Sequence, residues 1–437
     1  MDGSGRRAGV TALFVWLSGY WTEVRAPSHR VKRFITFTTV QKSRYSWGMT
    51  TVKNPYRASL GVDPPLLVGR DEVISDFSYA LDNGPGTHER ITVVTGARGV
   101  GKTVLLNSFE DRARERGWVV LSETATPGFC RRLGDEADLH AEKLEGREVP
   151  KLRGVQAAGF GVQWEGGSRV APDGLRASLN ALLDQIESMA VAVGQPPAGV
   201  LITLDELHHH SRDELIELAA VTQHLVREER EISVVLAGIP SAVKPLLQSK
   251  EDTNPITFIR RANRVNLGAV APSDIRMALG TPAEDAGVTW VGEALETAVR
   301  ACGGYPFLIQ LVGDWSFRAR NGDVIDEDSV VKGVAKARRK MGQLVHEPAL
   351  HDLSGVDRSF LAYMALDDGP SVVADIADRM GVSRPYAGNY RRRLLDAEMI
   401  VEAGYGKVDY ALPYMREYLR DHAVAAGIGP LTDDPQD

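Results

Sequence analysis

One stretch constrains the fold of this chain more than any other: "ITVVTGARGVGKTVLL", residues 91–106. The β-branched run from Ile91 to Val94 predicts a buried strand. The pattern G-x-x-x-x-G-K-T follows, and residues 104–116 then place apolar side chains on one side and charges on the other, as in an amphipathic helix. A bare turn between strand and helix is the alternative, but this succession is the context that a phosphate-binding loop requires.

Each position of this loop suits the binding of a nucleotide phosphate. Glycines let the backbone turn tightly and approach phosphate oxygens, and successive N–H groups at a helix N-terminus attract an anion. The motif places Lys102 at the β- and γ-phosphates of ATP and the Thr103 hydroxyl on Mg²⁺. The predicted nucleotide-binding residues of the loop are Gly96, Ala97, Arg98, Gly99, Val100, Gly101, Lys102, Thr103 and Val104.

A second acidic motif completes the predicted site. Val200 to Leu204 are apolar and are followed by Asp205, which we expect to hold the metal, and Glu206, which we expect to act as general base. Without the phosphate loop, this acidic pair would be read as a helix N-cap and first-turn acid. His208–His210 follow; adjacent histidines cannot share one helix face, so we expect the start of a helix with one histidine as a nucleotide sensor rather than a metal site.

The rest of this region alternates strands with amphipathic helices, which predicts an α/β fold with a mainly parallel sheet. Further strands are expected at 117–124, 231–241 and 263–270, and further helices at 178–193 and 213–228. Residues 127–176 break the pattern: they are rich in glycine and charge, and "GVQAAGFGVQWEGGSRV" is typical of a hairpin inserted between strand and helix.

The motifs together resemble those of AAA+ ATPases. "LLVGRDEV" (66–73), "GARGVGKT", "LITLDE", "VVLAGIPS" and "FIRRANRVNLGAV" occur in the order seen in that family, and the likeness covers residues 60–345. It is closest to the branch of archaeal and origin-recognition initiators and to related signal-transduction ATPases. The resemblance therefore implies a P-loop NTPase domain that carries an α-helical lid.

The resemblance also implies roles for residues outside the loop. Val68 and Pro306 would lie near the adenine, and Arg260 and Arg261 fall where such proteins carry an arginine finger, acting within the chain or on a neighbouring subunit. Equally, these arginines can be a solvated helix end that complements the helix dipole.

Two positions depart from the family pattern. The strand at 232–238 lacks the following Asn or Thr that senses the γ-phosphate, with Ser241 as a possible substitute, and Gln310 stands where many members have a sensing arginine. We therefore expect slow hydrolysis and a switch rather than a motor.

Four helices, expected at 272–281, 290–302, 304–320 and 326–343, predict the lid. Residues 349–422 then predict a winged helix-turn-helix domain, with a helix from Arg384 to Ala397 after a turn at Gly381, followed by a β-hairpin. Arginine and asparagine suit base edges and phosphates, so we expect double-stranded DNA as the partner; a protein-interaction module is the alternative. The predicted DNA-binding residues are Arg384, Asn389, Arg391, Arg392, Arg393 and Lys407.

Composition bounds these predictions. A net charge of −7 excludes a uniformly basic nucleic-acid coat, and two cysteines give neither a disulfide framework nor a zinc site, so we expect the cytoplasm. Residues 1–48 are predicted to be a disordered arm or sequence upstream of a true start at Met49, with a targeting role as the alternative; their apolar run is too short to span a bilayer. The basic run at 332–340 is either a solvated face or a phosphate contact.

Taken together, the sequence predicts a cytoplasmic Mg²⁺-dependent ATPase that converts ATP to ADP and phosphate and couples its nucleotide state to DNA. It is expected to assemble as a homo-oligomer or with a partner protein, without stable membrane association. The alternatives are a signalling or defence switch whose winged helix is an autoinhibitory or protein-interaction module, and a protein that binds nucleotide without hydrolysis. The predicted domains are 49–270 (nucleotide-binding), 271–345 (lid) and 349–422 (winged helix), with 423–437 as a disordered tail.

Overall fold

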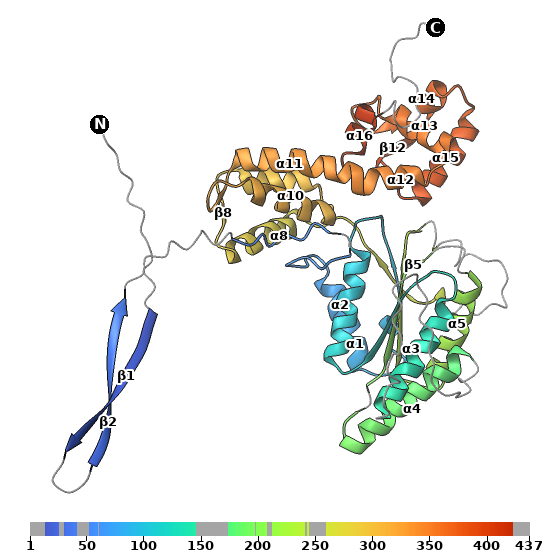
Figure 1. Cartoon of the computed structure of the whole chain (residues 1–437). Helices are drawn as coiled ribbons and strands as arrows, with labels where there is room; N and C mark the ends of the chain where they lie inside the picture. The colour runs from blue at the N-terminus through green and yellow to red at the C-terminus, as the bar shows by residue number, and fades with distance from the viewer. Residues whose placement is uncertain are drawn as a thin grey trace, which may run out of the picture. The chain divides into compact units, whose positions relative to one another are not determined.

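The computed structural model describes residues 14–25, 30–41, 52–59, 61–145, 174–196, 198–207, 212–240, 243 and 259–422, the first two ranges by their backbone. The chain divides into two units, residues 1–53 and 54–437. In the first unit, β1 (Phe14–Arg25) and β2 (Arg30–Gln41) pair antiparallel (Figure 1). The sequence led us to expect a disordered arm or sequence upstream of a true start here. The β-branched and aromatic residues of these two segments favour a pleated strand.

A five-stranded sheet forms the centre of the second unit, in the order β4-β5-β6-β3-β7, and all neighbouring strands are parallel. Its strands are β3 (Ile91–Thr95), β4 (Val119–Thr124), β5 (Val200–Leu207), β6 (Ile232–Gly238) and β7 (Asn263–Asn266). β6 is buried along its whole length, as expected of a strand that is covered on both faces. The predicted α/β fold with a parallel sheet is confirmed.

Helices cover both faces of this sheet (Figure 1). On one face lie α1 (Asp71–Asp82) and α2 (Lys102–Glu115), and on the other α3 (Phe129–Leu144), α4 (Leu175–Val193) and α5 (Arg212–Arg227). Phe77 of α1 stacks on Phe109 of α2, with ring centroids 4.2 Å apart. The larger core lies on the α3 side, where Leu121 and Ile202 of the sheet are fully buried among the helices.

Helix α3 differs from the prediction for residues 127–176, which were expected to break the pattern of strands and helices with an inserted hairpin. Its buried residues include Phe129, Leu133, Ala137 and Ala141, spaced four apart, so that one stripe of the helix faces the core. Because charged residues separate these apolar ones, the composition of the segment did not reveal the stripe. The hairpin expected around "GVQAAGFGVQWEGGSRV" lies outside the described residues.

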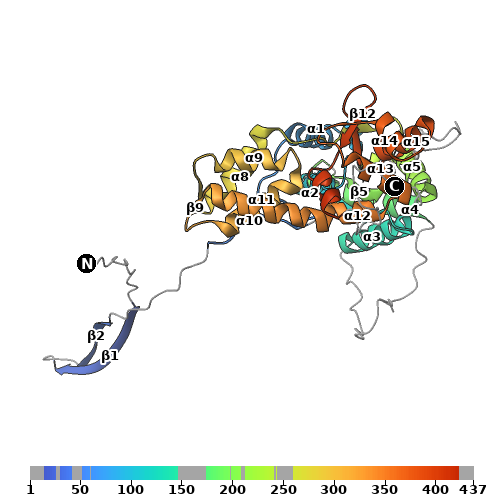
Figure 2. The same ribbon diagram turned by 90° about the horizontal axis from the view of Figure 1, so that it is seen from above.

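The lid elements agree closely with the prediction. They are α8 (Pro272–Asp285), β8 (Thr289–Trp290), α9 (Ala294–Cys302), α10 (Pro306–Ala319), β9 (Val324–Ile325) and α11 (Glu327–Met341), seen together in Figure 2. The segment that precedes α1 packs on this lid. Asn54 Nδ2 donates to Asp314 Oδ1 at 2.7 Å, and the Tyr56 hydroxyl donates to the Leu279 carbonyl.

Helix α11 continues through a π-helical turn, Gly342–His346, into α12 (Glu347–His351) and the C-terminal region. That region holds α13 (Gly355–Met364), β10 (Ser371–Val372), α14 (Val373–Arg379), α15 (Arg384–Asp396), β11 (Ile400–Glu402), β12 (Lys407–Tyr410) and α16 (Met415–His422). Its three strands form an antiparallel sheet in the order β10-β12-β11. The helices and the hairpin thus lie where the sequence analysis expected them.

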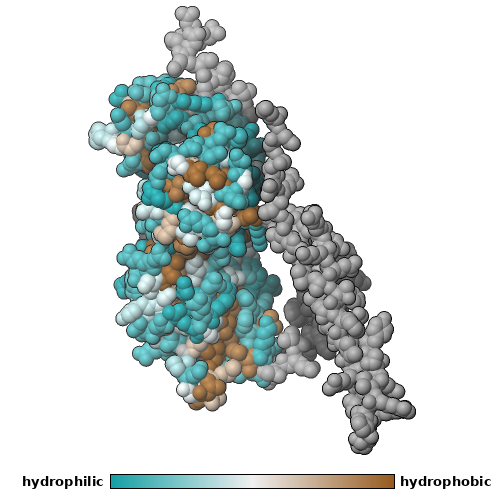
Figure 3. Space-filling view, turned by 90° about the vertical axis from the view of Figure 1, so that its left-hand side faces the viewer, coloured by the Kyte–Doolittle hydropathy of each residue, from teal (hydrophilic) through white to brown (hydrophobic). Residues whose placement is uncertain are grey.

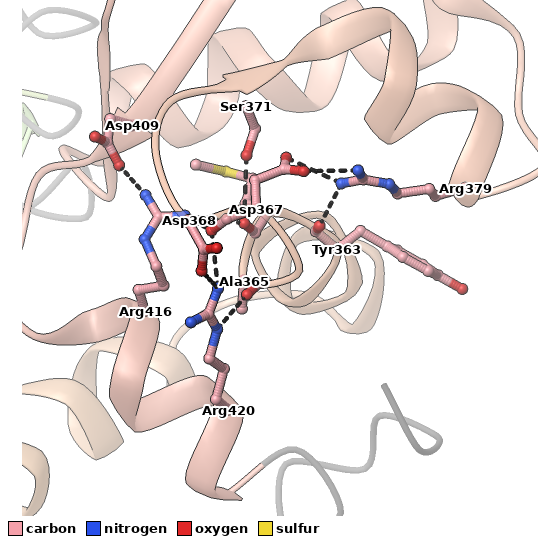
Figure 4. Close-up of polar contacts among 10 residues, drawn as sticks. Tyr363, Ala365, Asp367, Asp368, Ser371, Arg379, Asp409, Arg416 and Arg420 are labelled. Atoms are coloured by element: carbon pink, nitrogen blue, oxygen red, sulfur yellow. Dashed lines mark hydrogen bonds and ion pairs between the residues drawn. The ribbon is translucent and has the colours of Figure 1, made fainter. Parts of the chain in front are cut away.

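Ion pairs tie the C-terminal helices together (Figure 4). The loop after α13 offers Asp367, which Arg379 of α14 contacts, and Asp368, which Arg420 of α16 contacts. Arg416, one turn earlier on α16, pairs with an aspartate of β12. The partly buried pairs of Arg379 and Arg416 therefore join elements of the fold, whereas the pair of Arg420 is exposed to solvent.

The face of the second unit that Figure 3 shows is mainly polar. Hydrophilic residues cover most of the face in Figure 3, with apolar residues in small areas between them. Within the described part of the chain, no helix combines the length and the apolar character that crossing a membrane would need.

Candidate active site

A cavity of about 780 Å³ lies at the start of α2, at the carboxyl ends of β5 and β6. Parallel strands place ligands at this edge of a sheet. Four parts of the chain line it: the segment 57–70, the loop 98–104, the ends of β5 and β6, and the lid with residues 344–348 beyond it. Segments far apart in the sequence therefore enclose one site.

The phosphate loop needs glycine where the structure bends most. Gly99 and Gly101 have φ angles of 74° and 93°, in the left-handed region. A Cβ on Gly99 would also lie 2.2 Å from the Tyr305 hydroxyl, which donates to the Arg98 carbonyl. A side chain at position 99 is thus excluded twice, by backbone strain and by the lid.

Lys102 is held by the loop itself. Its Nζ donates to the carbonyls of Gly96 and Ala97 at 2.7 and 2.9 Å. Burial lowers the pKa of Lys102, and the negative charges of Glu398, Asp205 and, to a smaller extent, Glu206 act against this shift. The ammonium group therefore sits among carboxylates at the mouth of the loop.

Thr103 and Asp205 come together as predicted. The Thr103 hydroxyl donates to Asp205 Oδ2 at 2.6 Å, across 102 residues of sequence. The other oxygen, Asp205 Oδ1, accepts from the backbone N–H of Glu206 at 2.8 Å. Two hard oxygen donors thus face the cavity beside Lys102.

Glu206 has an unusual backbone. Its φ is 56°, rare for a residue other than glycine, and it lies at a bulge of β5. Leu204 pairs with Leu236 but Leu207 pairs with Gly238, so β5 has one residue more than β6 over this stretch. The bulge turns the exposed Glu206 towards the cavity that it lines, the kind of strained position that clusters at active sites.

The other predicted cofactor residues divide into two groups. Val68, Val104 and Pro306 line the cavity, as do the loop residues from Arg98 onward. Gly96 and Ala97 lie beneath it and contribute the carbonyls that hold Lys102. Ser241 and the three histidines at 208–210 lie outside the described residues.

Comparison with protein-family models gives two matches. A model of the AAA ATPase domain matches residues 66–235. Residues 66–235 therefore form an ATPase domain of the AAA+ type. A second model, of a domain of unknown function (DUF8462), matches residues 343–419 of this ATPase.

A solved structure supports the fold of this chain, and two others are similar to it more weakly. A Walker-type ATPase of Pyrococcus abyssi aligns with a TM-score of 0.55 and 18% identity, over 81% of this chain and 96% of its own. The Orc1 protein of Aeropyrum pernix in complex with DNA aligns with a TM-score of 0.39 and 17% identity, over 83% and 95%. A RuvB variant of Thermotoga maritima gives 0.41 and 16%, over 84% and 98%. Among curated proteins, none matches the chain.

Arg260 and Arg261 do not line the cavity of their own ATPase chain. They lie in the turn before β7, with Arg260 half-buried and Arg261 exposed. Among the described residues, the cavity wall therefore includes neither of these arginines.

The C-terminal region of the ATPase contributes to the site in a way that the sequence did not signal. Arg98 of the phosphate loop pairs with Asp352, after α12, at 2.6 Å. Leu344, Val345 and Pro348 form part of the cavity wall. Only the folded chain brings these residues together, because no motif links positions so far apart.

The predicted DNA-binding residues lie on α15 and the β11–β12 hairpin, but they are not equivalent. Arg393 pairs with the buried Asp357 at 2.7 Å, and Arg391 pairs with Glu402 at 2.6 Å. Within the described part of the chain, the other predicted cations have no ion-pair partner. The exposed residues of the predicted set without such a partner are Arg384, Asn389, Arg392 and Lys407.

Proposed function

We propose that this ATPase hydrolyses ATP slowly, with Mg²⁺, and couples its nucleotide state to the binding of double-stranded DNA through a C-terminal winged helix. We place it in the cytoplasm, where its two buried, unpaired cysteines would stay reduced. We also propose that Arg261 acts as an arginine finger on a second subunit.

The residues of the cavity fit Mg²⁺ and a triphosphate. Mg²⁺ prefers oxygen ligands and keeps several waters, which suits the Thr103 hydroxyl and the Asp205 carboxylate at the cavity mouth. When bound, the metal would neutralise charge on the phosphates. Lys102 would give up its two loop carbonyls to contact the β- and γ-phosphates, and Glu206 would take a proton from the attacking water.

The order of elements in the C-terminal region supports the winged helix. Three helices, α13 to α15, precede the β11–β12 hairpin, which serves as the wing. α15 begins at the N-cap Ser383 and carries exposed Arg384 and Arg392. Such a helix suits a major groove, and Lys407 on the hairpin suits the neighbouring phosphates.

The proposed coupling between nucleotide binding and DNA binding rests on one observation, the Arg98–Asp352 ion pair at 2.6 Å. Arg98 belongs to the loop that would surround the phosphates, and Asp352 leads directly into α13. Any shift of Arg98 towards a phosphate must weaken its contact with Asp352. We therefore expect ATP and DNA each to change the affinity of the protein for the other, by the same factor.

The test measures the binding of random duplex DNA with and without a non-hydrolysable ATP analogue, over a range of salt concentrations. We expect salt-sensitive binding whose Kd changes several-fold with the analogue, and a smaller change in Asp352→Asn. Asp328→Asn, on the exposed side of α11, is the matched control. Absence of salt-sensitive DNA binding in the wild type would refute the DNA-binding part of the proposal.

A second candidate is a switch in which the C-terminal region restrains the ATPase and contacts no DNA. The negative charge of Glu398, directly after α15, acts on Lys102. Under this alternative, Glu398→Gln raises ATP affinity while duplex DNA has no effect on turnover in any variant.

A further inference from the structure

The base end of the cavity contains a buried side-chain amide, Gln310, that the proposed chemistry does not use. Gln310 lies on α10, one turn after Pro306, and both residues line the cavity with Phe307 between them. It is only 8% exposed. Most of its neighbours on this wall, such as Val68 and Ala278, are apolar.

One hydrogen bond fixes how this amide is turned. The backbone N–H of Arg57 donates to Gln310 Oε1 at 3.0 Å. An amide has one acceptor oxygen and one NH₂ group with two donors, so a bond to the oxygen orients the NH₂ the other way. Within the described part of the chain, that NH₂ has no hydrogen-bond acceptor.

Because Gln310 lines the cavity and its oxygen is taken by Arg57, its NH₂ group can donate to an acceptor on a bound ligand. The nucleotide phosphates belong at Lys102, and the base therefore falls between the segment 57–70 and the lid. Adenine has an acceptor, N1, on its Watson–Crick edge. Guanine has an N1–H donor in the same position, flanked by a 2-amino donor and the O6 acceptor.

We propose that Gln310 selects adenine over guanine by donating from Nε2 to N1 of the base. Guanine would place a donor against this donor and leave both unpaired, which lowers its affinity. This inference rests on the proposed binding of a nucleotide in the cavity. Gln310 thus acts as a specificity residue rather than as a sensor of the γ-phosphate.

The experiment measures the Kd of ATP and of GTP for the wild type, Gln310→Glu and Gln310→Met. We expect the wild type to favour ATP by about tenfold or more. Gln310→Glu keeps an oxygen for the Arg57 N–H but offers guanine an acceptor, so the ratio of the two Kd values should fall at least tenfold. Gln310→Met, which keeps the volume and has no donor, should bring the ratio close to one.

Gln195→Glu, an exposed position after α4, controls for the added charge and should keep the wild-type ratio. A purely structural role of Gln310 would weaken both nucleotides equally; an unchanged ratio in both Gln310 variants would therefore overturn this inference. Equal affinity of the wild type for ATP and GTP would overturn it too. Failure of the wild type to bind any nucleotide would instead refute the proposed function itself.

Discussion

The sequence predicted functional residues in both the phosphate loop and helix α15, but the structure places the two sets of side chains differently. At the loop, Lys102, Thr103, Asp205 and Glu206 converge on one cavity. On α15, two of the arginines are engaged within the domain, one with the buried Asp357. The difference shows that a motif with fixed spacing predicts which side chains lie together. A run of like residues does not predict which of them share a surface.

The reason lies in what each pattern demands of the backbone. The loop requires glycines in the left-handed region and a lysine that can reach back to the loop carbonyls, and few other structures accept that pattern. A run of arginines on a helix turns about 100° per residue, so neighbours point in different directions. Arg392 and Arg393 accordingly differ in partner although they are adjacent.

The largest expected effect tests the catalytic side of this comparison. Glu206→Gln should lower ATP turnover by about 10²-fold or more, because it removes the general base, while ATP affinity stays near the wild-type value. Single-turnover hydrolysis and equilibrium nucleotide binding measure the two quantities. Glu229→Gln is the matched control, since Glu229 also has a positive φ, 54°, but does not line the cavity. Equal turnover in both variants would contradict the assignment.

A second prediction concerns the junction between the two regions, where His346 is fully buried and its Nε2 lies 2.9 Å from the Pro413 carbonyl. Burial lowers the pKa of His346 to about 4, below its ordinary 6.5. Between pH 4 and pH 6.5 the unfolded chain therefore binds a proton at this histidine, whereas the folded chain does not. The free energy of unfolding consequently falls as the pH drops from 6.5 towards 4. The loss approaches about 3 kcal/mol at the acid end.

Urea unfolding at pH 7 and pH 5 measures this loss. His346→Gln removes the titrating group while keeping a donor, so its free energy of unfolding should depend less on pH than that of the wild type. An identical pH dependence in the two proteins would assign the effect to other groups.

A third prediction separates the arginines of α15 by stability. Arg393→Ala leaves the carboxylate of Asp357, which is 2% exposed, without its charged partner. We expect a loss of about 1–3 kcal/mol in the free energy of unfolding. Arg384→Ala, at the exposed start of the helix, should change it by less than about 0.5 kcal/mol. Thermal unfolding compares the two, and equal losses would mean that the ion pair does not stabilise the domain.

The smallest expected effect is on DNA. Arg392→Ala should weaken duplex binding several-fold and reduce the salt dependence by about one phosphate contact, without a change in stability. Titrations at several salt concentrations measure both quantities. A variant with the wild-type salt dependence would show that α15 does not contact phosphates, and would favour the restraining role of the C-terminal region.

Most of the fold could be predicted from local patterns. The strands from β3 to β7 and the lid helices follow from hydrophobic periodicity and from glycine and proline at their ends. Helix α3 was missed because its apolar stripe, such as Leu133 and Ala137, is sparse among charged residues. The strands β1 and β2 were missed because a lone hairpin has no core that marks it in the sequence.

By itself the sequence determined the phosphate loop, the acidic strand end and the order of strand and helix, since each depends on residues close together in the chain. Only the tertiary structure decided that Asp352 meets Arg98, that Glu206 sits at a bulge, and that Gln310 turns its oxygen to Arg57. These contacts depend on how separate elements pack against one another. A short motif fixes its own backbone, but its partners across the fold are set by the packing of the whole unit.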